Sequence, residues 1–179
     1  MPFEKNCALA QNFCVPGTAP AFDEFDHRLL ALLQRDAGAT LTALGEAIGL
    51  SPSAVQRRIT RYRKAGLLRQ VAILDPKPLG ITLAAVWVQM ERESARVHAA
   101  FATRMRAATE VQQCYVLAGE WDYLVIRATT GVAHCREVAE RLFHDEGNVR
   151  RYETRMVFDA VKLGLELPTR QSPRRRRAK

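Results

Sequence analysis

Features typical of several protein classes are missing from this sequence. No apolar run approaches the roughly 20 residues of a membrane span, and the N-terminal stretch lacks the compact apolar core of a signal peptide. The four cysteines have neither Cys-x2-Cys nor Cys/His zinc spacing, and no nucleophile–base pair stands out. We therefore expect a cytoplasmic protein that has no membrane contact, needs no metal or cofactor, and is not an enzyme.

Acidic residues are also missing from one stretch of the chain. From Gln56 to Arg69 there are six basic residues and no acidic one. An ordinary solvated helix mixes charges of both signs, because opposite charges one turn apart stabilise it. The overall net charge of +8 says less, because Arg170, Arg174–Arg177 and Lys179 supply six positive charges. The stretch from Gln56 to Arg69, whose charged residues are all basic, therefore indicates a negatively charged partner.

This stretch follows a tight turn between two predicted helices. Thr40 is a suitable N-cap, and Gly49 suits the left-handed residue that ends the first helix. Ser51 and Pro52 fit the N-cap and first position of the second helix. Apolar residues recur there at helical spacing, at Val55, Ile59 and Tyr62. The pattern is that of a helix-turn-helix, whose second helix enters the major groove of double-stranded DNA.

The exposed side of the second helix supplies the candidate DNA contacts. Arginine and glutamine can bind guanine and adenine edges, whereas hydroxyls and basic side chains also bind phosphates. The candidates are Ser51, Ser53, Gln56, Arg57, Arg58, Thr60, Arg61 and Lys64.

The remainder of the chain predicts a second domain. Apolar residues at strand and helix spacing predict strands and helices in the order β-α-β-β-α-β. This is the ferredoxin-like arrangement, in which both helices lie on one face of the sheet. The strands are expected at 82–90, 111–117, 123–129 and 149–161, and the helices near 97–108 and 132–142. The other sheet face, which includes Trp87, would leave apolar side chains exposed to solvent. We therefore expect a partner subunit to cover it.

The expected fold class is therefore α+β, with an N-terminal helix-turn-helix and a C-terminal ferredoxin-like domain that pairs with a second subunit. The first helix is expected over Asp23–Asp36, with Phe25, Leu29, Leu32 and Leu33 on its buried face. The expected divisions are a flexible extension (1–21), the DNA-binding domain (22–74, with a strand at 67–74), a hinge (75–80), the second domain (81–167) and a disordered basic tail (168–179).

From Phe22 to Leu167 the chain resembles the Lrp/AsnC (leucine-responsive, feast/famine) family of transcriptional regulators. The resemblance is carried by FDEFDHRLLALLQRDA, GLSPSAVQRRITRYRKAGLL, LDP, CYVLAGEWDYLV and ETRMVFDAVK, in this order and spacing. It implies an N-terminal winged helix-turn-helix joined to a C-terminal βαββαβ effector and oligomerisation domain (81–167). It implies a sequence-specific regulator that forms a homodimer through that domain, often a tetramer or octamer. It also implies a small effector, typically an amino acid, bound where dimers meet.

The resemblance further implies the effector-site residues. The turn after 111–117 matches the family's ligand loop, in which Asp122 would accept from an α-amino group and backbone N–H groups would hold a carboxylate. Trp121 is bulkier than the residue common at its position. The implied residues are Gly119, Glu120, Trp121, Asp122, Tyr123, Thr154, Arg155 and Met156.

Two other functions stay open at this point. Some relatives of this fold decarboxylate a modified tetrapyrrole, and the residues available for that chemistry are His134, His144, Arg136, Arg141 and Tyr115. The other alternative is an architectural protein that coats DNA without sequence preference. The Arg-rich tail suits either DNA-binding function, because each phosphate contact steepens the salt dependence of binding.

Overall fold

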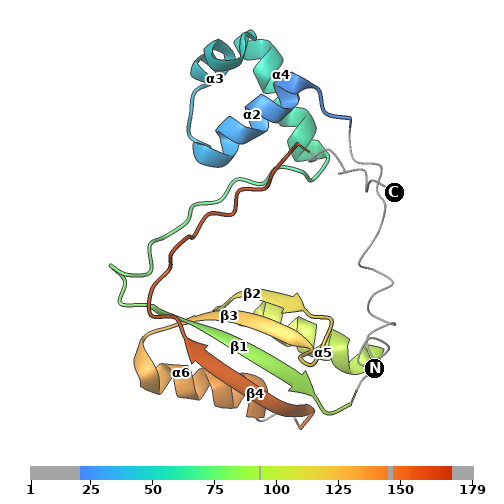
Figure 1. Cartoon of the computed structure of the whole chain (residues 1–179), viewed down its shortest axis with the longest axis vertical. Helices are drawn as coiled ribbons and strands as arrows, with labels where there is room; N and C mark the ends of the chain where they lie inside the picture. The colour runs from blue at the N-terminus through green and yellow to red at the C-terminus, as the bar shows by residue number, and fades with distance from the viewer. Residues whose placement is uncertain (1–20, 93, 145–146, 171–179) are drawn as a thin grey trace, which may run out of the picture. The chain divides into compact units, whose positions relative to one another are not determined.

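A computed structural model describes residues 21–92, 94–144 and 147–170, which divide into two compact units (Figure 1). Among the described residues, the helical domain contains 21–73 together with 162–170, and the sheet domain runs from Leu74 to Val161. The expected extension (1–21) lies outside the described residues except for Ala21, as does the expected tail beyond Arg170.

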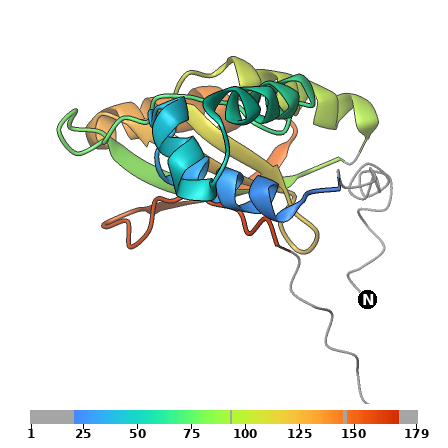
Figure 2. The same cartoon turned by 90° about the horizontal axis from the view of Figure 1, so that it is seen from above.

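The helical domain is a bundle of three helices (Figures 1 and 2), namely α2 (Glu24–Arg35), α3 (Leu41–Ile48) and α4 (Pro52–Lys64). The predicted caps are confirmed: the Thr40 hydroxyl accepts from the Ala43 amide at 3.1 Å, and the Ser51 hydroxyl accepts from the Ala54 amide at 3.3 Å. Such caps satisfy amides that the first helical turn leaves unpaired.

Two glycines shape the turn between α3 and α4. Gly49 ends α3 with φ at 76°, a left-handed conformation that favours glycine. Gly45 lies where a Cβ would come within 2.4 Å of the Leu50 carbonyl oxygen. The close approach of helix α3 to the turn therefore requires a residue without a side chain at Gly45.

The buried face of α2 differs from the predicted one. Residues Asp26, Leu29, Leu30 and Leu33 are buried, whereas Phe25 is 38% exposed and Leu32 is half-buried. The predicted face was based on apolar residues alone, whereas the buried carboxylate of Asp26 shares the face with the leucines.

The sheet domain has the predicted order of elements. It comprises β1 (Thr82–Met90), α5 (Ala95–Ala107), β2 (Val111–Val116), β3 (Tyr123–Thr129), α6 (Gly131–Ala139), the π-helical turn η1 (Glu140–His144) and β4 (Val149–Met156). The strands lie in the order β2-β3-β1-β4, and all neighbours are antiparallel. The α+β class and the βαββαβ arrangement are thus confirmed.

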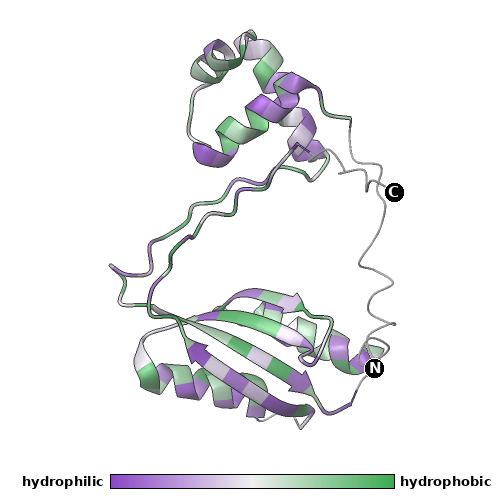
Figure 3. Cartoon of the chain, viewed as in Figure 1, coloured by the Kyte–Doolittle hydropathy of each residue, from purple (hydrophilic) through white to green (hydrophobic). Residues whose placement is uncertain are grey.

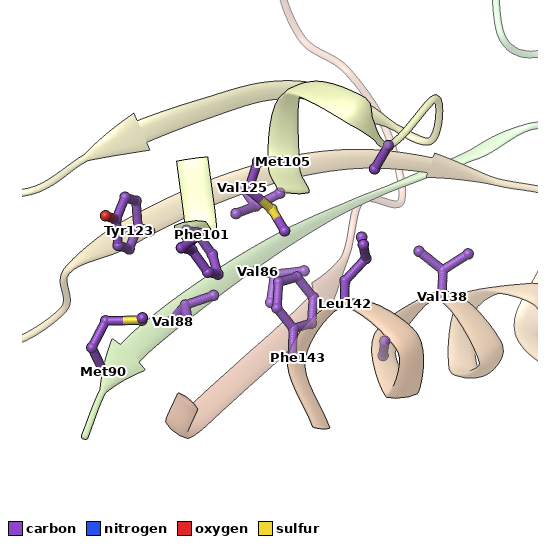
Figure 4. Packing of buried hydrophobic residues seen from close by; sticks show 12 residues of the cluster. Val86, Val88, Met90, Phe101, Met105, Tyr123, Val125, Val138, Leu142 and Phe143 are labelled. Carbon is purple, nitrogen blue, oxygen red and sulfur yellow. The ribbon is translucent and has the colours of Figure 1, made fainter. Parts of the chain in front are cut away.

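One sheet face packs on α5, α6 and η1 (Figure 4). Alternate side chains of β1 and β3, such as Val86, Val88 and Val125, meet Phe101 of α5 and Phe143 of η1. In Figure 3 the central strands are mainly hydrophobic, while the edge strand β4 carries hydrophilic bands. Every helix in the described part of the chain is too short or too polar to span a membrane.

One expected strand is corrected. The strand expected at 67–74 is not formed, and Val71 and Ile73 are more than half exposed. The fourth strand, β4, ends at Met156, inside the expected range of 149–161, and the next residue, Val157, donates its amide to the Leu83 carbonyl at 2.9 Å. The described residues from Lys162 onward group with the helical domain, where Leu167 bonds to Gln34.

Candidate nucleic-acid interface and effector loop

Helix α4 presents a polar, cationic surface opposite its buried face. Val55, Ile59 and Tyr62 are buried against α2 and α3, so the intervening residues face outward. Seven of the eight candidate contacts lie within α4, and Ser51 is its N-cap. Exposed side chains are those of Ser51, Ser53, Gln56, Arg57, Arg61 and Lys64, while Thr60 and Arg58 are half-buried.

The polar candidates on α4 are ordered by local hydrogen bonds. The hydroxyls of Ser51 and Ser53 lie 3.1 Å apart, and the Gln56 amide donates to the Thr60 hydroxyl at 3.3 Å. These contacts fix side-chain directions on the outward surface. Arg57 and Lys64 are exposed cations on the same surface.

A buried carboxylate of α2 braces α4 from behind. Asp26 is 1% exposed, and its Oδ1 accepts hydrogen bonds from the Tyr62 hydroxyl, from Arg58 and, at 2.7 Å, from Arg61. Arg58 also forms a two-point contact with Asp23, at 2.8 and 3.0 Å. Its guanidinium lies 5.8 Å from the ring centre of the partly exposed Phe25.

The network changes the acidity of its members. Burial alone would raise the pKa of Asp26, but hydrogen bonds from Tyr62, the Asp23 amide and Arg58 outweigh burial and lower it to about 2. Burial and the bond to Asp26 raise the pKa of Tyr62 to about 12. Asp26 is therefore ionised at neutral pH, and its negative charge offsets part of the positive charge of α4.

This arrangement divides the predicted arginines into two groups. Arg58 is turned toward α2, so its observed contacts support a role in positioning α4. Arg61 contacts Asp26 but keeps 56% of its side chain exposed, so it can also meet a phosphate. Asp26 was not among the predicted residues, although its spacing of three residues from Leu29 places it on the apolar face of α2.

The predicted effector loop is a turn between β2 and β3. Glu120 pairs with Arg151 of β4 at 2.7 Å, and the Arg151 guanidinium lies 4.4 Å from the Trp121 ring centre. Gly119 has φ at 149°, a value that favours glycine at this turn. Arg151 was not among the predicted residues. Its pairing with Glu120 across the sheet could be found only from the strand register.

Two loop residues have their polar groups engaged within the domain. Asp122 is buried, and its carboxylate accepts from the Met90 amide at 2.7 Å, which caps the end of β1. Tyr123 is buried between α5 and the sheet, with its hydroxyl 2.6 Å from Nδ1 of His98. The role of Asp122 as acceptor for an α-amino group stays a prediction.

The predicted residues of β4 lie on opposite faces of the sheet. Thr154 accepts from the buried Arg127 at 3.4 Å, and the Met156 sulfur is 3.8 Å from the Cys135 sulfur, both on the helix side. Arg155 points the other way, with its guanidinium 4.9 Å from the Trp87 ring centre. Adjacent strand residues alternate between faces, so these three cannot all line one pocket of a single subunit.

The side chains proposed for tetrapyrrole chemistry occupy the surface of the sheet domain. Arg141 and His134 both approach Glu110, at 2.5 and 3.9 Å, and Arg136 pairs with Glu140 at 3.1 Å along one helix face. Tyr115 and His144 are exposed. The contacts described for His134, Arg136 and Arg141 are thus surface ion pairs.

The fold and the braced cationic helix define a two-domain, helix-turn-helix DNA-binding protein. Residues 22–63 match the AsnC-type helix-turn-helix domain, and residues 83–167 match the Lrp/AsnC ligand binding domain. An uncharacterized HTH-type transcriptional regulator of Sinorhizobium fredii is 31% identical over 84% of this chain and 90% of its own length. The DNA-binding transcriptional activator DecR of Escherichia coli is 30% identical over 82% of this chain and 97% of its own length.

Solved structures agree with these matches. A transcriptional regulator from Neisseria meningitidis in complex with L-methionine aligns with a TM-score of 0.77 and 28% identity, over 83% of this chain and 97% of that one. An AsnC family regulator from Agrobacterium tumefaciens aligns with a TM-score of 0.76 and 25% identity, over 82% of this chain and 97% of that one. The chain belongs to the Lrp/AsnC family of transcriptional regulators.

Proposed function

We propose that this regulator binds a two-fold operator as a homodimer or a larger homo-oligomer in the cytoplasm, with α4 in the major groove of each half-site. The observation that carries the proposal is the outward surface of α4, which is cationic and polar, on a helix whose Arg61 and Tyr62 bond to the buried Asp26. In this proposal Arg57, Arg61 and Lys64 bind phosphates or guanines. Ser51, Ser53, Gln56 and Thr60 supply the remaining polar contacts, and Arg58 sets the position of the helix.

The DNA contact is tested with Arg57→Ala combined with Arg61→Ala. Operator affinity, measured by fluorescence anisotropy, is expected to fall at least tenfold, because two cations leave the groove-facing surface. The matched control removes two exposed arginines of the sheet domain, Arg96→Ala with Arg136→Ala. Equal affinities for the α4 variant and the wild type would contradict the proposal.

The same assay separates a specific regulator from a DNA-coating protein. A regulator prefers the operator to random duplex by about a thousandfold or more at physiological salt. A coating protein binds both duplexes equally. Equal competition by unlabelled operator and random DNA would therefore favour the architectural alternative.

The dimer contact is proposed on the sheet face opposite α5 and α6. Trp87, Leu124 and Ile126 alternate with the buried residues of β1 and β3, so they point away from both helices. Neither helix of the domain covers this apolar centre, and a second copy presenting the same face would. Ile126→Glu is expected to lower the mass measured by light scattering to that of a monomer, whereas Gln112→Glu, at an exposed position, is the control. An unchanged mass for Ile126→Glu would contradict this interface.

The proposed effector is an amino acid that contacts residues 119–123 where dimers meet. Support comes from the L-methionine complex of the Neisseria regulator and from the ordered Trp121–Arg151–Glu120 cluster at the loop. A thermal-shift screen of the twenty amino acids at millimolar concentrations tests it, because a bound ligand stabilises the folded state. The expected result is stabilisation by one amino acid or a small group, reduced in Trp121→Ala. No shift with any amino acid would contradict the proposal.

A further inference from the structure

The turn between β2 and β3 is hydrogen-bonded to the end of β1. The Leu117 amide donates to the Asp122 carbonyl at 2.8 Å, and the Asp122 amide donates to the Val88 carbonyl at 3.0 Å. At the tip of the turn, the side-chain amide of Gln89 donates to the Glu120 carbonyl at 3.2 Å. These bonds place the side chains of the turn beside the last residues of β1 and beside β4, which pairs with them.

The side chain of Arg151 reaches the same turn from β4. Gln89 and Arg151 are partners in the register of β1 and β4, so their side chains lie on the same sheet face. Gln89 bonds to the backbone of Glu120, and Arg151 bonds to its carboxylate at 2.7 Å. The Arg151 guanidinium also lies 4.4 Å from the ring centre of Trp121, where the face of the ring attracts a cation.

Both charges of this ion pair are open to solvent. The side chains of Arg151 and Glu120 are 52% and 69% exposed, and an ion pair of this kind contributes little to folding. The bond described between them joins one guanidinium nitrogen, Nη2, to one carboxylate oxygen, Oε1. A guanidinium carries five N–H donors in a planar fork, and a carboxylate accepts at both oxygens. Each partner of the pair can therefore bind a further group of opposite charge.

The second carboxylate of the turn is less suited to a ligand. Asp122 is 6% exposed, and its Oδ2 accepts from the Met90 amide at 2.7 Å. An ammonium group at this oxygen would give up its hydration on entering the core, which is costly for a charge. It would also compete with the amide that caps β1. Glu120 is the other acidic residue between Leu117 and Tyr123, and it has neither drawback.

We propose that Arg151 and Glu120 form a receptor for the zwitterionic part of an amino acid, with Arg151 binding the α-carboxylate and Glu120 binding the α-ammonium group. The inference rests on the proposed function, because it requires an amino-acid effector at this turn. The four charges alternate in sign around a ring, so each lies between two opposite charges and the existing ion pair stays intact. Trp121 is a positioning residue, because its ring holds the plane of the Arg151 guanidinium. The receptor selects free amino acids, since amides and N-acyl derivatives lack one of the two charges.

Ligand derivatives that lack one charge test the receptor in the full chain. L-methionine, L-leucine and L-phenylalanine are each compared with their amide and their N-acetyl derivative by isothermal titration calorimetry. Loss of one charged contact is expected to weaken binding about tenfold or more. Both derivatives should therefore bind the wild type less tightly than the free amino acid. Equal affinities for the free amino acid and its two derivatives would overturn the proposal.

Two single variants assign each ligand charge to its partner. In Arg151→Gln the amide is expected to bind as tightly as the free amino acid, while the N-acetyl derivative stays weaker. In Glu120→Gln the expected result is the reverse. The matched controls are Arg150→Gln and Glu91→Gln, because these residues form an exposed pair between the same two strands, at 3.9 Å. Both control variants should keep the wild-type pattern of affinities.

The pattern of affinities distinguishes ligand recognition from a structural role. If Arg151 were only structural, Arg151→Gln would weaken the free amino acid and the amide by the same factor, and this result would overturn the carboxylate contact. If N-acetylation is penalised as strongly in Glu120→Gln as in the wild type, the amino group binds elsewhere, for example at Asp122. That result would overturn the ammonium contact.

These measurements also separate the inference from the proposed function. If an amino acid binds the wild type and the variants keep its preference for both charges, only the inference fails. If none of the twenty amino acids binds the wild type, the proposed effector fails and the inference fails with it. DNA binding by α4 is measured independently in either case.

Discussion

Each of the two domains contains a buried ionisable side chain, and the two side chains differ in their contacts. Asp26 in the helical domain and Arg127 in the sheet domain are each 1% exposed. Asp26 meets two arginines and a tyrosine. The contacts described for Arg127 are all with neutral groups: the Cys135 carbonyl at 2.9 Å, the Cys135 sulfur at 3.1 Å, Thr154, and the ring of Phe143.

This difference in contacts is reflected in the pKa values of the two groups. Hydrogen bonds overcome burial at Asp26 and stabilise its charged form, whereas burial lowers the pKa of Arg127 and disfavours its charge. A buried charge with ionic partners is costly to remove, because its partners lose their counter-charge. A buried charge among neutral groups is cheaper to replace by an apolar side chain of similar size.

The largest expected effect follows the removal of the Asp26 carboxylate. Asp26→Ala leaves the buried Tyr62 hydroxyl without its acceptor and removes a carboxylate partner from Arg58 and Arg61, so it should destabilise the helical domain by about 3 kcal/mol. Both tryptophans, Trp87 and Trp121, lie in the sheet domain. Urea unfolding followed by helical circular dichroism should therefore shift, while tryptophan fluorescence serves as the internal control. Glu46→Ala, at an exposed position of α3, should change neither signal, and equal behaviour of both variants would count against the network.

A smaller effect is expected from acid. The pKa of Asp26 is about 2 in the folded protein, below its ordinary value of 3.8. Its stabilising contribution is therefore complete above pH 4 and is lost as the pH falls toward 2, which amounts to roughly 2 kcal/mol. Asp26→Asn removes this titration, so unfolding of the helical domain should depend less on pH between 4 and 2 than in the wild type. Parallel pH profiles for the two proteins would contradict the low pKa.

Local signals in the sequence predicted most of the architecture. Ser51, Pro52 and Gly49 define the turn through caps and backbone conformation, which depend on neighbouring residues only. The strands 82–90 and 123–129 follow from alternation and match the structure at both ends. The family resemblance came from several such segments in order, and the comparisons confirm it.

Contacts between distant residues could not be predicted in this way. Asp26 meets partners 32 to 36 positions away, and Gln34 meets Leu167 across 133 positions. The effector set combines residues from both faces of the sheet, since Thr154 and Arg155 are adjacent on a strand and alternation places their side chains on opposite faces. Their joint role in one effector site stays a prediction.

The smallest expected effect concerns Arg127, and it tests the comparison most directly. Arg127→Met keeps most of the side-chain volume in the core beside Phe143 and removes a charge that lacks an acidic contact among the described residues. The free energy of unfolding of the sheet domain, followed by tryptophan fluorescence, should stay within about 1 kcal/mol of the wild type or rise. A loss as large as that of Asp26→Ala would mean that Arg127 has a charged partner in the assembled protein. The contrast between the two domains would then be a property of the isolated chain only.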